Sequence, residues 1–297
     1  FWKHILFSIF IFMMFGFLYN RYSTKIYKSS TTLLIKEENK SGLGSNNLFE
    51  GLDLFGGQKN IKNEIGILKS FSLTRKTLEK LNSRVSYFHS GNFKSIDIYT
   101  KTPFYAEIDI SQPQIISDKF HIELISEDEF ILKFNAKNSK LYDLNNEKYI
   151  SNKEFSYEYE NTHNFGEIIK TDFFSFKIYK NDLSLFLDEN WTNYYFTISS
   201  YNDLTKTYIK NTNVTEIEKD ASILKISIEG SNPEKLNDFL NKFIELYLAR
   251  GLDEKNKITT NTIQFINQQL DLISDSLSEV ETNLERFKEK NPKIELS

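Results

Sequence analysis

The chain has 297 residues with 37 Lys or Arg and 41 Asp or Glu, so its formal net charge at pH 7 is −4. This acidic balance argues against nucleic acid as a partner, because nucleic-acid-binding proteins carry a basic stripe. No cysteine occurs, which excludes disulfide bonds, thiolate catalysis and zinc–thiolate sites. Hydrophobic residues make up 39% of the chain and aromatic residues 15%, enough for a folded core.

The first twenty residues are almost uniformly apolar. No charge occurs from Ile5 to Tyr19, a run that would form a helix of about 22 Å, and the stretch from Phe1 to Asn20 would reach about 30 Å, the thickness of a bilayer core. The run has no amphipathic stripe, and no small-residue cleavage site of a signal peptide follows it. We therefore predict a transmembrane helix over residues 1–21, with membrane lipid as its partner.

Residues 22–116 read as the first part of an α/β base. Alternation from Ile26 to Ile35 predicts a strand, and a glycine-rich loop follows between Gly42 and Gly57. This loop is not a phosphate-binding loop, because no Gly-Lys-Ser/Thr follows it. Helical spacing predicts a helix from Asn60 to Leu81 with an irregularity near residues 70–72, and short strands are expected on either side of Pro103.

Residues 117–205 are rich in short segments with a period of two. Turn residues separate several of these segments, which predicts an antiparallel meander with one buried and one solvated face. The inward positions are Phe120/Ile122/Leu124, Phe130/Leu132/Phe134, Phe155/Tyr157/Tyr159, Phe174/Phe176/Ile178 and Tyr194/Phe196/Ile198.

Residues 206–251 are predicted to close the base with a strand and a helix. The strand covers Ile223 to Ile228. Asn232 followed by Pro233 is a good start signal for the helix, and Gly251 predicts a pause in it.

Residues 252–297 carry a heptad pattern and predict a long helix whose hairpin partner is missing. A helix from Asp253 to Lys290 would be about 57 Å long. Most flanking positions are uncharged, so salt bridges would select a partner weakly. An antiparallel hairpin within one chain and a coiled coil between chains both fit, and a returning helix would lie beyond Ser297. The apolar positions, which alternate three and four apart, are Ile263, Ile266, Leu270, Ile273, Leu277, Val280, Leu284 and Phe287.

No catalytic, cofactor-binding or metal-binding residue is assigned. Clustered carboxylates from Ser126 to Glu129 could act on a sugar, but four polar residues between two strands favour a solvated hairpin turn. Trp191, Tyr194 and Tyr195 could stack on sugar rings, but an aromatic sheet core is favoured. The histidines lack the spacing of metal ligands. They are His4, His89, His121 and His163.

Taken together, these segments resemble the polysaccharide co-polymerase, or chain-length determinant, family. They are most similar to the periplasmic region of bacterial tyrosine autokinases that drive capsule and exopolysaccharide export. The stretches that carry the resemblance are YKSSTTLLIK, NEIGILKSFSLTRKTLEKL, IYTKTPF, NFGEIIKTDFF, ILKISIEGSNPEKLNDFLNKFIELYLARGLDEKN and TTNTIQFINQQLDLISDSLSEVETNLERFKEKN.

The resemblance implies an α+β fold: a membrane-proximal α/β base with a strand-rich insertion, an N-terminal transmembrane helix and a long C-terminal coiled-coil-like helix. It implies a homo-oligomeric ring at the bacterial inner membrane, largely periplasmic, that regulates the length and export of exopolysaccharide, capsule or O-antigen. A polysaccharide polymerase and an outer-membrane export channel are the implied partners. Many family members carry a cytosolic tyrosine kinase domain after a second span, and only such a domain would need ATP and Mg²⁺.

A second interpretation stays open at this point. The chain could be a membrane-anchored extracytoplasmic glycan-binding protein or glycan-active enzyme that works through its β-rich middle.

Overall fold

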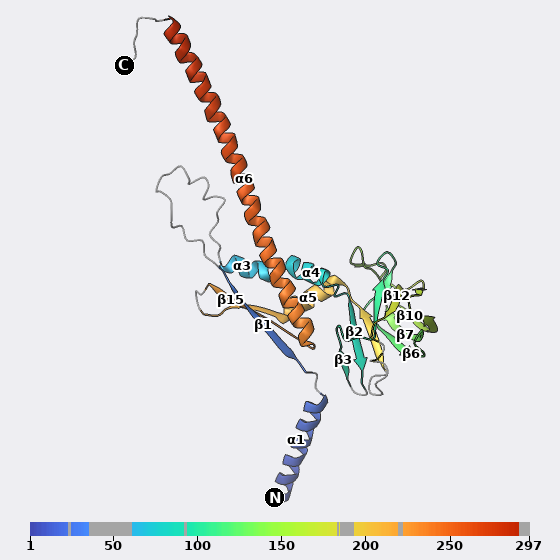
Figure 1. The fold of residues 1–297 in the computed structure, drawn as a ribbon. Coiled ribbons are helices and arrows are strands. Elements are labelled where there is room, and N and C mark those ends of the chain that lie inside the picture. Colours follow the sequence, from blue (N-terminus) through green and yellow to red (C-terminus); the bar gives the residue numbers. More distant parts are fainter. Residues whose placement is uncertain are drawn as a thin grey trace. The chain divides into compact units, whose positions relative to one another are not determined.

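The computed structural model describes residues 1–22, 25–35, 61–91, 94–182, 184, 193–218 and 222–290 (Figure 1). These residues have an α+β fold with a strand-rich body and a long C-terminal helix. The chain divides into two compact units, one of residues 1–36 and 61–246 and one of residues 37–60 and 247–297. The predicted glycine-rich loop and Trp191 lie outside the described residues.

The first helix, α1, covers Trp2–Tyr22. Among the described residues, none of the helices has both the length and the apolar character that crossing a bilayer requires. The predicted transmembrane helix over residues 1–21 is therefore wrong, while membrane lipid as a partner stays a prediction. The uncharged run that begins at Ile5 covers only about 22 Å of the ~30 Å core, and Lys3 and His4 precede it.

A three-stranded antiparallel sheet forms the base, in the order β1 (Tyr27–Leu34), β15 (Ile223–Gly230), β14 (Thr212–Glu216). The register pairs Leu33 with Leu224, so segments far apart in sequence lie side by side. Leu224, Ile226 and Ile228 of β15 are buried, as the period of two expects, and Ser227 between the last two is buried as well. Both predicted strands of the base are confirmed.

Three short helices accompany this sheet: α3 (Ile61–Leu68), α4 (Phe71–Lys80) and α5 (Tyr201–Asn211). Ser70 interrupts the predicted helix from Asn60 to Leu81, because its hydroxyl caps α4 by accepting from the backbone N–H of Leu73 at 3.3 Å. The irregularity predicted near residues 70–72 is thereby confirmed. Helix α5 was not predicted, although Ser200 caps it by accepting from the N–H of Asp203 at 3.0 Å.

The strand-rich body contains the other sheets. The largest has the order β10 (Phe155–Asn164), β7 (Glu129–Ser139), β6 (Lys119–Leu124), β13 (Tyr194–Ile198), β2 (Val85–Ser90), β3 (Ser95–Asp97). The second has the order β11 (Ile168–Lys170), β12 (Ser175–Lys180), β4 (Phe104–Ile108). The third has the order β5 (Gln114–Ile115), β8 (Leu141–Asp143), β9 (Lys148–Tyr149).

All five strands predicted in the middle of the chain are present, but the single meander is wrong. Strand β12 pairs with β4 in a separate sheet, while β2 and β3 join the largest sheet. Every pairing is antiparallel, and most join strands that are not consecutive. Alternation shows which residues face inward, but it carries no information about which strands pair over long distances.

Aromatic rings hold the two main sheets of the body together. Phe120 stacks on Phe134 and Phe196 within its own sheet, with ring centroids 4.4 and 5.0 Å apart. From the second sheet and the turn before it, Phe176 and Phe174 meet the same ring edge-on at 5.2 and 5.3 Å. All five rings are at most 2% exposed. Such contacts add about 0.5–1.5 kcal/mol per pair to the burial of the rings.

The last helix, α6, runs without interruption over Pro233–Lys290, a length of about 87 Å (Figure 1). Asn232 caps it as predicted, since its Oδ1 accepts from the N–H of Lys235 at 3.2 Å. The predicted pause at Gly251 is absent, because a single glycine costs only about 1 kcal/mol within a helix. The first turns bury apolar side chains in the base: Leu236, Phe239, Leu240 and Phe243.

Candidate functional site: an exposed apolar face on the long helix

Helix α6 presents a continuous apolar face, defined here as the eight residues of the predicted heptad seam. Each of these side chains has between 43% and 63% of its surface exposed. The structure therefore places every predicted position on one helix, with about half of each side chain exposed. The members of the apolar face are Ile263, Ile266, Leu270, Ile273, Leu277, Val280, Leu284 and Phe287.

The spacing of the apolar face determines the shape of what can cover it. A spacing of three and four averages 3.5 residues per turn, so the stripe drifts by about 20° per heptad around a straight helix. From Ile263 to Phe287 the drift is therefore about 70°. A straight partner helix would lose contact with the apolar face along its length, so a helix that covers the whole face must wind around α6 in a left-handed supercoil.

Burial of the apolar face provides a substantial driving force. Complete burial of a Leu, Ile, Val or Phe side chain is worth about 1.5–3 kcal/mol, and roughly half of each side chain is still exposed. Eight such residues would contribute on the order of 8 kcal/mol. This lies within the range of about 4–15 kcal/mol that association costs, so the face alone makes a partner marginally stable and additional contacts must help.

The flanks of the apolar face are polar on one side and partly apolar on the other. Phe265 and Leu272 are 46% and 62% exposed and form a second, shorter apolar strip beside the N-terminal half of the face, from Ile263 to Ile273. Asn267, Gln269 and Ser274 flank the face without charge. The N-terminal half of the apolar face therefore offers a wider apolar surface than the C-terminal half.

A feature that sequence reasoning missed is the charge of the same helix. Residues 258–285 contain no Lys or Arg. With Ile263 counted as heptad position a, only Glu281 lies at a position that flanks the apolar face, and the other acidic residues of the stretch lie at positions b, c or f, away from it. A simple count of signs along the heptads would have found this bias. The acidic residues of the stretch are Asp271, Asp275, Glu279, Glu281 and Glu285.

The start of α6 is fastened to the strand-rich body by charged groups. Lys235 Nζ lies 3.0 Å from Asp97 Oδ2, and the two side chains are only 18% and 7% exposed. Ser86 accepts a further hydrogen bond from the same ammonium at 3.1 Å. Tyr99 donates to Asp238 at 2.8 Å, and burial together with this hydrogen bond raises the pKa of Tyr99, so the phenol remains a donor. The attachment thus combines a buried ion pair with an exposed hydrogen bond.

Among the described residues, the chemical candidates of the sequence do not converge on a reaction centre. Tyr194 and Tyr195 are 1% and 4% exposed, which confirms the aromatic-core interpretation. The carboxylate cluster forms the exposed turn between β6 and β7, where Ser126 Oγ accepts from the N–H groups of Asp128 and Glu129 at 3.3 and 3.1 Å. The solvated hairpin turn is therefore confirmed.

The histidines are dispersed. His89, on β2, is 6% exposed, while His163, on β10, shares a 2.8 Å hydrogen bond with Tyr159. The pKa of His121 is lowered by burial and by nearby Lys119. Among the described residues, no group of three or more His, Asp or Glu side chains is arranged to hold a metal ion.

Comparison with known proteins finds a match to one family model and similarity to bacterial tyrosine-protein kinases. The model of the Wzz family, described as chain length determinant protein, matches residues 1–81. The predicted resemblance is confirmed. A putative tyrosine-protein kinase in the cps region of Klebsiella pneumoniae is 23% identical over 298 residues, which covers 94% of this chain and 36% of that protein.

Two shorter matches agree with this. The putative tyrosine-protein kinase AmsA of Erwinia amylovora is 29% identical over 104 residues, which covers 34% of this chain and 14% of that protein. The tyrosine-protein kinase wzc of Salmonella typhi is 25% identical over 103 residues, with the same two shares. The match to the Klebsiella protein includes almost the whole of this chain but only about a third of the length of that protein.

Proposed function

We propose that this chain is part of a polysaccharide co-polymerase, in which it helps to regulate the chain length and export of a bacterial surface polysaccharide. The observation that carries this proposal is the exposed apolar face on α6, in a chain that resembles chain-length determinants. The setting we propose is the periplasmic side of the inner membrane. The proposed partners are further copies of the chain, a polysaccharide polymerase and an outer-membrane export channel.

The mechanism we propose is geometric. The first turns of α6 are attached to β3 of the strand-rich body through the buried pair of Lys235 with Asp97. A covered apolar face would hold each α6 at a defined angle and would therefore set the spacing between copies in an oligomer. Regulation of polymer length would follow from this spacing, and residues 1–297 need no catalytic group for it.

The test is to place charge on the apolar face. Leu270 and Leu277 are 58% and 57% exposed, so Leu270→Asp with Leu277→Asp should leave the fold intact but prevent burial of the face. Loss of two partly buried leucines costs about 3 kcal/mol of association free energy, or more than a hundredfold in the association constant, and the buried charges add to this. Native mass spectrometry should therefore show smaller assemblies, and cells that depend on the variant should make polysaccharide of altered length.

A matched control adds the same two charges elsewhere on α6. Gln264 and Gln268 are exposed and, at 100° per residue, lie opposite the apolar face. Gln264→Asp with Gln268→Asp should change neither assembly size nor polymer length. If the double leucine variant behaves like this control in both assays, the proposal is wrong.

The alternative of a glycan-active enzyme is less well supported. A glycosidase needs a carboxylic acid whose pKa is raised so that it can protonate the leaving oxygen. Among the described residues, the one carboxylate cluster singled out from the sequence lies in a solvated turn and is held by backbone hydrogen bonds. Binding of a glycan without hydrolysis remains compatible with the strand-rich body.

A further inference from the structure

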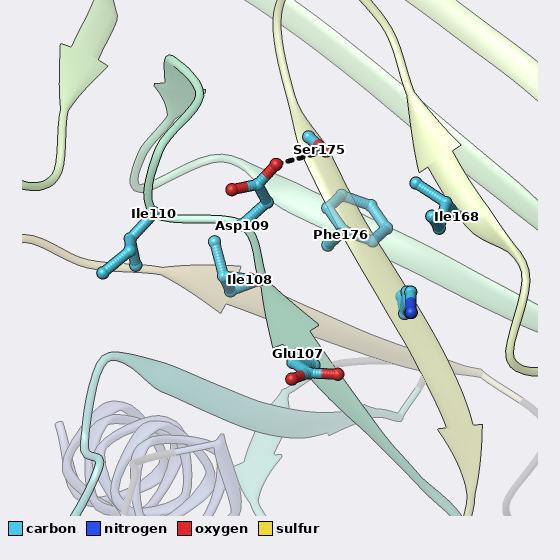
Figure 2. Close-up of a pocket in the computed structure, with 8 residues that line it drawn as sticks. Glu107, Ile108, Asp109, Ile110, Ile168, Ser175 and Phe176 are labelled. Carbon is cyan, nitrogen blue, oxygen red and sulfur yellow. Dashed lines mark hydrogen bonds between the residues drawn. The ribbon is translucent and has the colours of Figure 1, made fainter.

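A shallow hollow lies on the three-stranded sheet of β11, β12 and β4. Its volume is about 340 Å³, near the lower end of the range of ~300–1,000 Å³ found for small-molecule sites. Figure 2 shows β12 running through the middle, with Ile168 of β11 on one side and the segment from Glu107 to Ile110 on the other. Residues 175–177 of β12 complete the lining.

The wall of the hollow alternates between apolar and charged groups. Ile110 and Ile168 are 50% and 61% exposed, so aliphatic surface faces the solvent at both ends. Between them, Lys177 pairs in register with Ile168 on one neighbouring strand and with Glu107 on the other. One row across the sheet therefore carries an aliphatic, a cationic and a carboxylate side chain.

The rim at Asp109 is held in place by a buried glutamine. Gln114 is fully buried, and its Nε2 donates to the carbonyl oxygens of Asp109 at 2.8 Å and Ser175 at 3.0 Å. Its Oε1 accepts from the N–H of Ser175 at 3.2 Å, so both ends of the amide are satisfied. An unsatisfied buried amide would cost about 1–3 kcal/mol, and Gln114 therefore holds the two strand ends in a single geometry. The rim is preorganised before any ligand arrives.

Both carboxylates of the hollow act as hydrogen-bond acceptors. Hydrogen bonds from Ser111 lower the pKa of Asp109, with a further bond from the hydroxyl of Ser175 at 3.3 Å (Figure 2). Tyr179 donates to Glu107 Oε2 at 2.9 Å, and this bond raises the pKa of Tyr179 so that the phenol remains protonated. The lowered pKa of Asp109 is the opposite of what a general acid needs, which favours binding over hydrolysis.

Aromatic surface lies beside the hollow. Tyr105 and Tyr179 are stacked across β4 and β12, with ring centroids 5.0 Å apart and an angle of 19° between the planes. They occupy the row next to Glu107 and Lys177 on the same face, because side chains two residues apart on a strand point to the same side. Tyr105 is 46% exposed.

We propose that this hollow binds neutral saccharide units of a glycan chain. Sugar hydroxyls would donate to Glu107 and Asp109, and the C–H faces of the rings would pack against Ile110, Ile168 and the exposed tyrosine. The two carboxylates are balanced by Lys177 in the lining and by Lys170, which acts on Asp109, so the hollow has no net charge to attract an ionised sugar. This inference rests on the proposed function, in which the chain works beside a growing polysaccharide.

The experiment is an NMR titration of the 297-residue chain. The probe is a mixture of short oligosaccharides released from the surface polysaccharide of the organism that encodes the chain. Amide shifts should concentrate on β4, β11 and β12, and Ile168→Glu should weaken binding about tenfold, because an aliphatic contact is replaced by a carboxylate. Glu107→Gln keeps the shape of the rim and should weaken binding less.

The matched control is Ile96→Glu. Ile96 is also a strand isoleucine, 44% exposed, but it lies on β3 in another sheet. Absence of oligosaccharide binding, shifts that map elsewhere, or equal weakening by the two isoleucine variants would each overturn the proposal. Binding confined to uronate-bearing oligosaccharides would overturn the neutral-saccharide assignment.

Different results would refute the glycan-binding proposal and the co-polymerase proposal. If the hollow does not bind glycan while charge on the apolar face of α6 still alters assembly and polymer length, the proposed function stands without this site. If the hollow binds glycan while the α6 variants change nothing, the chain is a glycan-binding module and the co-polymerase proposal is wrong.

Discussion

Two ion pairs of similar length involve the first turn of α6, and loss of the carboxylate should destabilise the protein far more in the buried pair than in the exposed pair. Lys235 and Asp97 are 3.0 Å apart, and Lys101 and Glu234 are 2.9 Å apart. The first pair is 18% and 7% exposed, whereas the second is 73% and 47% exposed. At these distances the attraction is about 5 kcal/mol for an effective dielectric constant of ~20 but only about 1.4 kcal/mol in bulk water.

Desolvation and side-chain ordering reduce both values. We expect Asp97→Asn to lower the free energy of unfolding by about 3 kcal/mol, because it leaves a poorly hydrated ammonium without its counter-ion. Glu234→Gln should cost about 0–1 kcal/mol, as for other exposed ion pairs. The asparagine keeps the shape of Asp97, so the difference reports charge and not packing.

Urea denaturation followed by circular dichroism measures both changes. An increase in salt from about 0.1 M to about 1 M shortens the Debye length from ~10 Å to ~3 Å, which should remove the small effect of Glu234→Gln and leave most of the effect of Asp97→Asn. Adding Lys235→Met to Asp97→Asn should restore part of the lost stability, because no unpaired charge then remains. Equal costs for the two single variants would refute the reasoning that burial determines the strength of this attachment.

Two further predictions concern the glycines and a buried tyrosine. Gly230→Ala should destabilise the protein by about 1 kcal/mol or more, because the new Cβ would lie 3.0 Å from Cδ2 of the buried Leu236. Gly66→Ala should stabilise it by about 0.5–1 kcal/mol, because the new Cβ in α3 meets open space. If urea denaturation gave changes of the same sign for the two variants, this reasoning would be contradicted. Burial raises the pKa of Tyr87 from 10.0 to about 12, so its contribution to stability is complete below pH 10 and is lost as the pH rises from about 10 to about 12. Unfolding free energies measured across that pH range should fall less steeply in Tyr87→Phe, and an unchanged slope would argue against the assignment.

Much of the local structure was predictable because neighbouring residues determine it. The strand at Ile223 to Ile228 follows from alternation, the start of α6 from Asn232 and Pro233, and the interruption at residues 70–72 from a capping serine. Helix α5 carries a comparable signal, a serine three residues before an aspartate, and was missed because it follows directly after a strand.

The candidate sites differ in how far the sequence reveals them. The apolar face of α6 is readable from the sequence, since eight positions on one helix need only a regular period. The hollow on β11, β12 and β4 is not, because Ile168, Lys177 and Glu107 come together only through the register of three strands. Gln114, which holds its rim, has no sequence signal at all.

The sequence by itself determined the inward-facing residues of the strands and the heptad period of the last helix, since each depends on residues a few positions apart. Only the tertiary structure decided that β12 pairs with β4, that β1 pairs with β15, and that Lys235 meets Asp97. These contacts join segments that are distant in the chain. Their energy comes from complementary surfaces and from charges removed from water, and neither can be read from a local pattern.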